Sequence, residues 1–303
     1  MGAGAVGSFY GAMLARAGHA VTLIARPAHV RAILRDGLML TMAGRVDTVH
    51  LSASEDVAAV HQADLVLCCV KSTDTEAAAL QMRAHLKPDA VLMSLQNGVD
   101  NAETLARHLP CAVVPAVVYV ATAMPAPGQV QHFGRGDLVI GAGPGDRVLP
   151  EHTLQHLVEL FAGAGVVVRV SADVRAELWS KLLVNCAYNA ISGLAQLPYA
   201  RLAALPAIRD LQAEVVREVV DVAAASGVRL SLPDALQAVA GIAQAMPGQL
   251  SSTAQDMARR KPSEIDHLNG YVARRGAALG LATPANRALH ALVKLVESGY
   301  DAA

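Results

Sequence analysis

The pattern of apolar and polar positions changes character about halfway along the chain. In the first half, continuous apolar runs occupy residues 20–25, 64–70 and 90–95, each bounded by glycine or polar residues. Short runs of this kind are typical of strands buried on both faces of a sheet. From Asp173 onward the spacing is helical nearly throughout, with prolines as punctuation. We therefore predict an α/β domain over residues 1–170 and an all-α domain over residues 171–303.

Further short strands are expected in the first domain, separated by glycine and proline turns. They are predicted at residues 112–120, 129–133, 137–140 and 166–170. Their close spacing favours antiparallel strands that complete the sheet.

Composition and charge narrow the class of ligand. A chain of 303 residues has room for two domains of ordinary size, and 25 basic against 26 acidic residues leave a formal charge of −1. No long run of one sign is present to attract nucleic acid or anionic lipid. The most apolar stretch, residues 111–124, is interrupted by Pro115 and is too short to span a membrane. We expect a cytoplasmic protein that binds a small molecule.

Metal and redox sites have no support in the spacing of their usual ligands. Cys68, Cys69, Cys111 and Cys186 contain no C-x-x-C pair, and the eleven histidines show no H-E-x-x-H motif. Buried, reduced thiols and no metal are expected.

The strongest local motif opens the chain. Gly2, Gly4 and Gly7, with Ala5 and Val6 between them, match G-x-G-x-x-G, and a helix is expected over residues 8–18 before the strand at 20–25. Such glycines allow a tight turn and let backbone N–H groups approach a pyrophosphate at the helix N-terminus. The motif predicts a dinucleotide-binding domain of the Rossmann type.

One part of this motif is absent from the sequence. A strand should precede the first glycine, and only Met1 does so. Either the true start lies upstream, or the protein tolerates an open slot where an interior strand normally lies. If the chain begins at Met1, its sheet should expose two unpaired edges and lose stability.

Polar residues at the ends of the predicted strands suggest how the dinucleotide is held. Arg26 follows the strand at 20–25, where folds that prefer NAD place an acidic residue for the ribose. A guanidinium suits a 2′-phosphate and favours NADP(H), the alternative being a solvated surface arginine. Lys71 and Asn97 follow the next two strands and are placed to touch cofactor or substrate.

In the helical half, Lys181, Asn185 and Asn189 are spaced i, i+4 and i+8 on an apolar helix and so share one face. Such a polar stripe either lines a cleft or lies solvated at a domain edge, with the lysine stem along the surface. A lysine beside a nicotinamide could stabilise and protonate a carbonyl oxygen.

A second polar cluster spans residues 251–256 and 261–270. Ser252 and Glu264 lie in it, but serines before a helix also serve as N-caps, and spacing alone leaves the two roles open.

Taken in order, these motifs resemble the ketopantoate reductase (2-dehydropantoate 2-reductase) family. The segments that carry the resemblance are GAGAVGSFYGAMLARAGHAVTLIAR, CVKSTDTEAA, SLQNGVDN, ELWSKLLVNCAYNAISGL, SSTAQDMARRKPSEIDHLNGYV and LATPANRAL. The resemblance implies a Rossmann domain joined to a helical domain, with NADPH and ketopantoate meeting between them. Ser252-Thr253 departs from a more usual Ser-Met pair.

The resemblance also implies roles for individual residues. Lys181 is similar to the family's catalytic lysine, and Glu264 to its partner acid, which also contacts the cofactor. Asn97 corresponds to a residue near the nicotinamide and the substrate carbonyl, Asn185 and Asn189 to groups that bind substrate hydroxyls, and Ser252 to one that binds the carboxylate. The implied cofactor-binding residues are Gly2, Gly4, Ala5, Val6, Gly7, Arg26, Lys71, Asn97 and Glu264.

The function implied is NADPH-dependent reduction of 2-dehydropantoate to (R)-pantoate for pantothenate and coenzyme A synthesis, with a homodimer as a possible assembly. Two alternatives stay open: a reductase of another branched 2-oxo acid, and a catalytically silent dinucleotide-binding protein.

Overall fold

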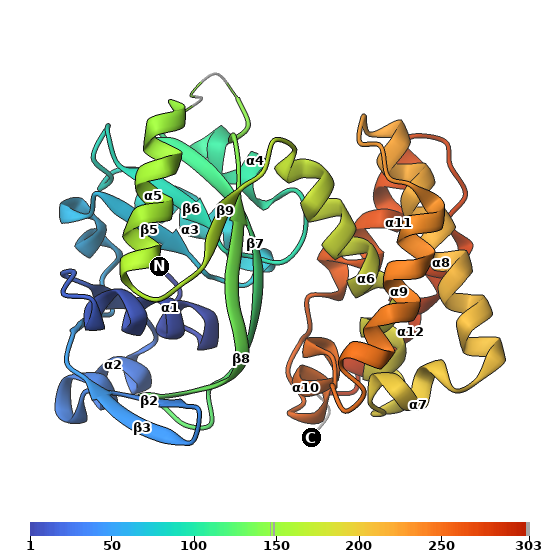
Figure 1. Cartoon of the computed structure of the whole chain (residues 1–303), viewed down its shortest axis with the longest axis horizontal. Helices are drawn as coiled ribbons and strands as arrows, with labels where there is room; N and C mark the ends of the chain where they lie inside the picture. The colour runs from blue at the N-terminus through green and yellow to red at the C-terminus, as the bar shows by residue number, and fades with distance from the viewer. Residues whose placement is uncertain (146, 148, 301–303) are drawn as a thin grey trace. The chain divides into compact units, whose positions relative to one another are not determined.

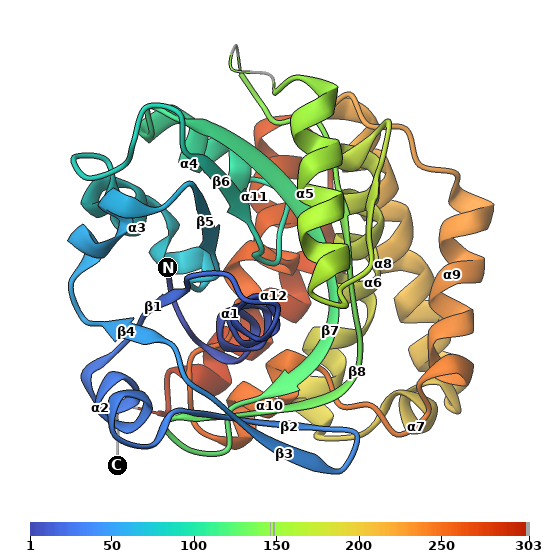
Figure 2. The same ribbon diagram turned by 60° about the vertical axis from the view of Figure 1, so that its left-hand side comes forward.

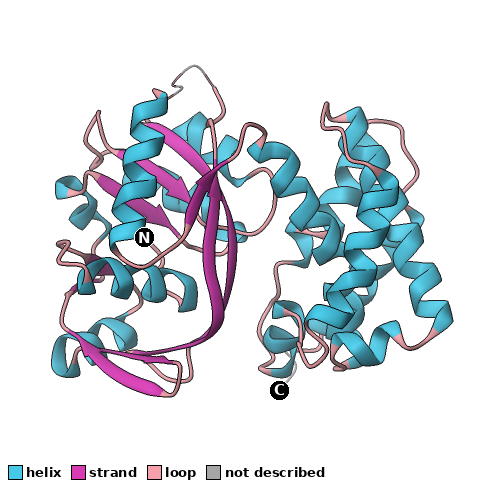
Figure 3. Cartoon of the chain, in the orientation of Figure 1, coloured by secondary structure: helices cyan, strands magenta, loops and turns pink. Residues whose placement is uncertain are grey.

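The computed structural model describes residues 1–145, 147 and 149–300, which divide into two compact units (Figure 1). The first unit is Met1–Val174 and the second is Arg175–Ala303. Among the described residues, strands occur only in the first unit, and the second unit is helical (Figure 3). The predicted α/β and all-α architecture is confirmed.

The first unit contains nine described strands. They are β1 (Thr22–Ile24), β2 (Leu38–Met42), β3 (Arg45–Val49), β4 (Ser52–Ser54), β5 (Leu65–Cys68), β6 (Val91–Ser94), β7 (Ala112–Ala123), β8 (Gln129–Ile140) and β9 (Val168–Val170). Seven of them form one sheet in the order β3-β2-β8-β7-β6-β5, with β9 beside β8, while β1 and β4 form a separate parallel pair. The β5–β6 pairing is parallel, as the buried apolar runs predict. The strand at 112–120 was expected to be antiparallel; β7 pairs with β8 in that way but with β6 in parallel.

The helices of this unit are α1 (Ala5–Arg16), α2 (Pro27–Asp36), η1 (Val57–Gln62), η2 (Ser72–Asp74), α3 (Thr75–Met82), α4 (Asn101–His108) and α5 (Glu151–Gly163). Side chains of α1 and α5 pack on one face of the sheet, and those of α3 and α4 on the other. Neighbouring strand residues such as Leu92 and Met93 therefore belong to opposite cores. This alternation follows from the two-residue period of a strand.

Three details of the sheet differ from the sequence prediction. The strands expected at 129–133 and 137–140 are one strand, β8, because Gly134, Arg135 and Gly136 take positive φ angles and bend it without ending it. The strand at the end of the unit, β9, pairs with β8 in parallel, not antiparallel. The β2–β3 hairpin was not predicted, because β3 is largely exposed and lacks an apolar run.

The expected pair of open strand edges is present. Of the described strands, β1 pairs only with β4 and β5 only with β6. Met1 lies between these two edges, as Figure 2 shows, where its amino group donates to the Leu67 oxygen at 2.8 Å.

His29 ties α2 to α1 and to the turn before β8. The Gly128 N–H donates to His29 Nδ1 at 2.7 Å, so the other ring nitrogen carries the proton toward Ser8 Oγ, 3.1 Å away. The Ser8 hydroxyl in turn donates to the Ala3 oxygen in the glycine loop at 3.2 Å. This neutral tautomer is the form that the contacts require.

Burial lowers the pKa of His29 below its ordinary value of 6.5. Its stabilising contribution is therefore complete above pH 6.5 and is lost as the pH falls through the lower folded-state pKa. We expect the melting temperature to drop further between pH 7.5 and 5.5 in the unmodified chain than in a His29→Gln variant. Equal pH dependence in the two proteins, followed by circular dichroism, would contradict this assignment.

The second unit is built on α6 (Val174–Ala195), with α7 (Tyr199–Ala203), α8 (Pro206–Ala225), α9 (Leu232–Ala245), α10 (Ser252–Ala258), η3 (Ile265–His267), α11 (Asn269–Ala278) and α12 (Pro284–Glu297). Gly193 of α6 allows α10 to approach closely, since a Cβ there would lie 2.7 Å from Met257 Sδ. Tyr188 of α6 donates to the Val239 oxygen in α9 at 2.8 Å.

The four cysteines are free thiols, three buried and Cys69 half-buried. Burial raises the pKa of all four, that of Cys69 to about 12. They are therefore poor nucleophiles and pack as small apolar groups, as predicted. Within the described residues, no group of three or more His, Cys, Asp and Glu residues is placed to hold a metal, and no helix is long and apolar enough to cross a membrane.

Candidate active site

The glycine loop presents an uncapped helix N-terminus. Gly4 is the N-cap of α1, and no side chain accepts a hydrogen bond there. The first N–H groups of the helix, which include those of Ala5 and Val6, have no acceptor one turn earlier. Such a terminus, with its positive helix dipole, suits a phosphate.

The three glycines of the motif differ in backbone conformation and in the space around them. Gly2 has a φ of 79°, and a Cβ on it would lie 2.6 Å from the Val70 nitrogen. A Cβ on Gly7 would lie 2.9 Å from the Gly2 oxygen. Gly4 is exposed, and a Cβ there would meet no heavy atom within 4 Å. Gly2 and Gly7 are thus required by the fold, whereas Gly4 keeps the approach to the helix terminus open.

Arg26 lies beside this loop at the end of β1. The Gly2 and Ala3 N–H groups both donate to the Ile24 oxygen, at 3.1 and 2.9 Å, which fixes the loop two residues from Arg26. Arg26 is the N-cap of α2 and is exposed. Its guanidinium is therefore free to meet an anion from solvent.

Lys71 and Asn97 lie in the loops that follow the neighbouring strands β5 and β6, as expected for the carboxyl ends of parallel strands. Lys71 is exposed and Asn97 is half-buried. The backbone oxygen of Asn97 accepts hydrogen bonds from Ser72 Oγ at 2.7 Å and from Asn101 Nδ2 at 2.6 Å. These bonds hold the two loops together.

Sequence reasoning missed the polar network beneath these loops. Gln96 Nε2 donates to the Val70 oxygen at 3.1 Å and to Thr75 Oγ1 at 2.7 Å, and Thr75 Oγ1 donates to Asn101 Oδ1 at 2.7 Å. Buried polar groups at the ends of apolar strands were the available signal, since each needs a partner. The network positions the edge of the sheet where Lys71 and Asn97 lie.

In the second unit, the predicted polar stripe lies on α6. Lys181 and Asn185 are half-buried, and Asn189 is only 3% exposed. The apolar residues beside the stripe, among them Leu182 and Cys186, are buried. Burial of this degree disfavours a fully solvated stripe.

The two serines at the start of α10 lie in different environments. Ser251 is the buried N-cap: its hydroxyl accepts from the Ala254 N–H at 3.0 Å and donates to the Asn189 oxygen at 3.2 Å. Ser252 is exposed on the first turn. Capping is thus performed by Ser251, and the neighbouring Ser252 is exposed near the Asn189 end of the stripe.

Glu264 lies in a short segment that is fixed on both sides. Before it, the Ser263 N–H and hydroxyl donate to the same Glu297 oxygen at 2.7 and 2.6 Å. After it, Asp266 accepts from His290 and Lys294 at 2.6 and 2.9 Å. Burial alone would raise the pKa of Asp266, but these two hydrogen bonds lower it, so the carboxylate stays charged.

The Glu264 segment is also tied to α6. Asn269, which opens α11 just after it, donates to the Cys186 oxygen at 3.1 Å. One anchor therefore joins α6 to the Ser252 segment and another joins α6 to the Glu264 segment. The structure assembles the glycine loop, Arg26, Lys71 and Asn97 within the first unit, and Lys181, Asn185, Asn189, Ser252 and Glu264 within the second.

Comparison with known proteins gives a consistent result over the whole chain. The family model described as ketopantoate reductase PanE/ApbA matches residues 1–145, and the model of that family's C-terminal part matches residues 173–297. A 2-dehydropantoate 2-reductase of Halobacterium salinarum is 32% identical over 299 residues, covering 98% of this chain and 97% of that protein.

Two solved structures are similar over nearly their full length. A PanE/ApbA family ketopantoate reductase from Ralstonia eutropha JMP134 is 53% identical with a TM-score of 0.92, covering 99% of this chain and 98% of that one. A ternary structure of D-mandelate dehydrogenase with NADH and anilino(oxo)acetate is 25% identical with a TM-score of 0.93, covering 99% and 97%.

Proposed function

The chain belongs to the ketopantoate reductase family, and from that premise we propose that it reduces 2-dehydropantoate to (R)-pantoate with NADPH, in the cytoplasm. The observation that carries the proposal is the largely buried stripe Lys181, Asn185 and Asn189 on α6. Hydrogen bonds tie both the Ser252 and the Glu264 segments to this helix. Together these residues supply a cation, two amides, a hydroxyl and a carboxylate, which are groups that can bind a hydroxylated 2-oxo acid. A homodimer remains a prediction.

The residues of the first unit fit a dinucleotide phosphate. The uncapped N-terminus of α1 offers N–H groups to the pyrophosphate, and the open position at Gly4 leaves room for it. Exposed Arg26 suits the 2′-phosphate through charge-assisted hydrogen bonds, and Lys71 adds a second positive charge. NADPH, when bound, supplies the hydride.

The residues of the second unit bind and polarise the ketone. The Lys181 ammonium donates a hydrogen bond to the ketone oxygen, stabilises negative charge as it develops there, and gives up a proton to form the alcohol. Asn185 and Asn189 bind the substrate hydroxyl, and Ser252 binds its carboxylate. Glu264 accepts a hydrogen bond that orients the bound substrate.

A second candidate keeps the chemistry and changes the substrate. Similarity to D-mandelate dehydrogenase over the full chain favours testing a bulkier 2-oxo acid without a hydroxyl. The two asparagines of the stripe distinguish the candidates, because buried amides left without a partner would penalise a substrate that lacks the hydroxyl.

The deciding experiment measures NADPH oxidation by the purified chain with three substrates: ketopantoate, 3,3-dimethyl-2-oxobutanoate, in which a methyl replaces the hydroxymethyl group, and benzoylformate. We expect kcat/KM for ketopantoate to exceed that for the methyl analogue by at least about 100-fold. Preference for benzoylformate would support the second candidate. No oxidation of NADPH despite its binding, measured by fluorescence titration, would leave the catalytically silent alternative.

A further inference from the structure

The two groups assigned to the anions of the dinucleotide lie in separate elements. One is the N-terminus of α1, where the pyrophosphate is proposed to bind, and the other is Arg26, the N-cap of α2. In NADPH the pyrophosphate and the 2′-phosphate are attached to the same ribose, so the distance between them varies little. Both anions bind at full strength only if the protein holds its two groups at a matching distance.

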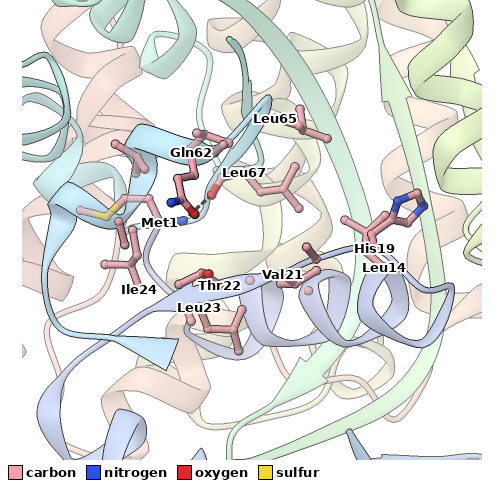
Figure 4. Close-up of a pocket in the computed structure, with 18 of the residues that line it drawn as sticks. Met1, Leu14, His19, Val21, Thr22, Leu23, Ile24, Gln62, Leu65 and Leu67 are labelled. Carbon is pink, nitrogen blue, oxygen red and sulfur yellow. Dashed lines mark hydrogen bonds between the residues drawn. The ribbon is translucent and has the colours of Figure 1, made fainter. Parts of the chain in front are cut away.

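The backbone joins these two groups along one route. Ile24 ends β1 and lines the cavity shown in Figure 4. Its oxygen accepts from the Ala3 N–H at 2.9 Å, and two residues later the chain reaches Arg26. This route alone does not fix the direction of α2, because each residue between β1 and the helix has two soft backbone dihedrals.

His29 supplies a second route through side chains. Its backbone N–H donates to the Arg26 oxygen at 3.0 Å, and its ring contacts Ser8 Oγ at 3.1 Å. The Ser8 hydroxyl donates to the Ala3 oxygen at 3.2 Å. Together with the bond between Ala3 and Ile24, these contacts close a ring that runs from the glycine loop through β1 and α2 back to the loop.

This second route is buried and is anchored to the sheet. Ser8 is fully buried and His29 is 6% exposed, so water does not compete for their hydrogen bonds. The other ring nitrogen of His29 accepts from the Gly128 N–H at 2.7 Å, and the Gly128 oxygen accepts from the Met39 N–H in β2 at 2.9 Å. These bonds fix the imidazole in the orientation from which it reaches Ser8.

We propose that His29 and Ser8 are positioning residues that set a preference for NADPH over NADH, by holding Arg26 at the distance from the glycine loop that the 2′-phosphate requires. The assignment rests on the proposed function, because it takes Arg26 as the group that binds the 2′-phosphate. NADH has no 2′-phosphate, so its affinity does not depend on this distance. The ratio of the dissociation constants for NADH and NADPH therefore reports the link, whereas a general loss of stability weakens both cofactors alike.

The test measures both dissociation constants by fluorescence titration of the purified chain, without substrate. Ser8→Ala and His29→Leu each break the link from one side, and we expect each to lower the NADPH preference about tenfold, within the range of one buried hydrogen bond. The double variant should lose no more than the stronger single variant, because both substitutions break the same link. His29→Gln keeps an N–H donor for Ser8 and should retain the preference within about threefold.

Ile33→Ala is the matched control, because Ile33 is buried on the same helix, at 2% exposed, and makes none of these hydrogen bonds through its side chain. It should lower the melting temperature at least as far as Ser8→Ala does and leave the NADPH preference within about twofold. An equal loss of preference in Ile33→Ala would show that any weakening of α2 suffices, and would overturn the assignment to His29 and Ser8.

Two further comparisons distinguish failure of the link from failure of the proposed cofactor. In an Arg26→Ala background, Ser8→Ala should leave the ratio unchanged, and a further tenfold or so fall would mean that Ser8 does not act through Arg26. An unmodified chain that binds NADH as tightly as NADPH would overturn the cofactor assignment and the link together. A clear NADPH preference that Ser8→Ala and His29→Leu both keep would overturn the link alone.

Discussion

Replacing Lys181 by alanine is expected to lower kcat about 1000-fold while the affinity for NADPH stays unchanged. The ammonium is assigned to the ketone oxygen, where it stabilises developing charge and supplies the proton, and general acid catalysis contributes factors of about 100 to 10,000. Steady-state kinetics with ketopantoate and fluorescence titration with NADPH separate the two effects.

A Lys181→Met variant is the matched control, because it keeps the length and packing of the side chain and removes only the charge. If the ammonium acts in chemistry, both variants lose kcat to a similar extent and both keep the melting temperature. Recovery of activity in Lys181→Met would assign the residue to packing against its buried neighbours on α6 instead.

Replacing Arg26 by aspartate is expected to change the ratio of kcat/KM for NADPH to that for NADH by a factor on the order of 100 to 1000. Hydrogen bonds to a charged group are worth about 1.5–3 kcal/mol, and the aspartate adds repulsion of the 2′-phosphate and an acceptor for the ribose hydroxyl of NADH. Stability should be kept, since Arg26 is exposed and aspartate is a favourable N-cap for α2.

Arg31→Asp serves as the control for the cofactor measurement, because Arg31 is exposed on the same helix and the substitution changes the net charge equally. It should leave the ratio within about twofold, since exposed charges at a distance are screened. An unchanged preference in Arg26→Asp would remove the basis for assigning the 2′-phosphate to this residue.

The fold could be predicted where burial sets the pattern and not where local backbone geometry does. The apolar runs at 64–70 and 90–95 became β5 and β6 because strands buried on both faces have no polar alternation. The continuity of β8 through Gly134 and Gly136 could not be predicted, because glycine marks a bulge and a turn equally well in sequence.

The candidate site could likewise be predicted only in part from the sequence. Spacing alone placed Lys181, Asn185 and Asn189 on one helical face, because three residues with i, i+4 spacing require no knowledge of tertiary structure. It could not show that Ser251 rather than Ser252 forms the cap, nor that Glu297 accepts both donors of Ser263 from 34 residues away. Such contacts depend on how helices pack.

Residues 1–3 tie the glycine loop to two strands. Met1 donates to the Leu67 oxygen in β5, while Gly2 and Ala3 donate to the Ile24 oxygen in β1, immediately before the N-terminus of α1. These bonds restrict the backbone of the loop before any ligand arrives. If the loop binds the dinucleotide as proposed, less conformational entropy is lost on binding, and the fold itself contributes to cofactor affinity.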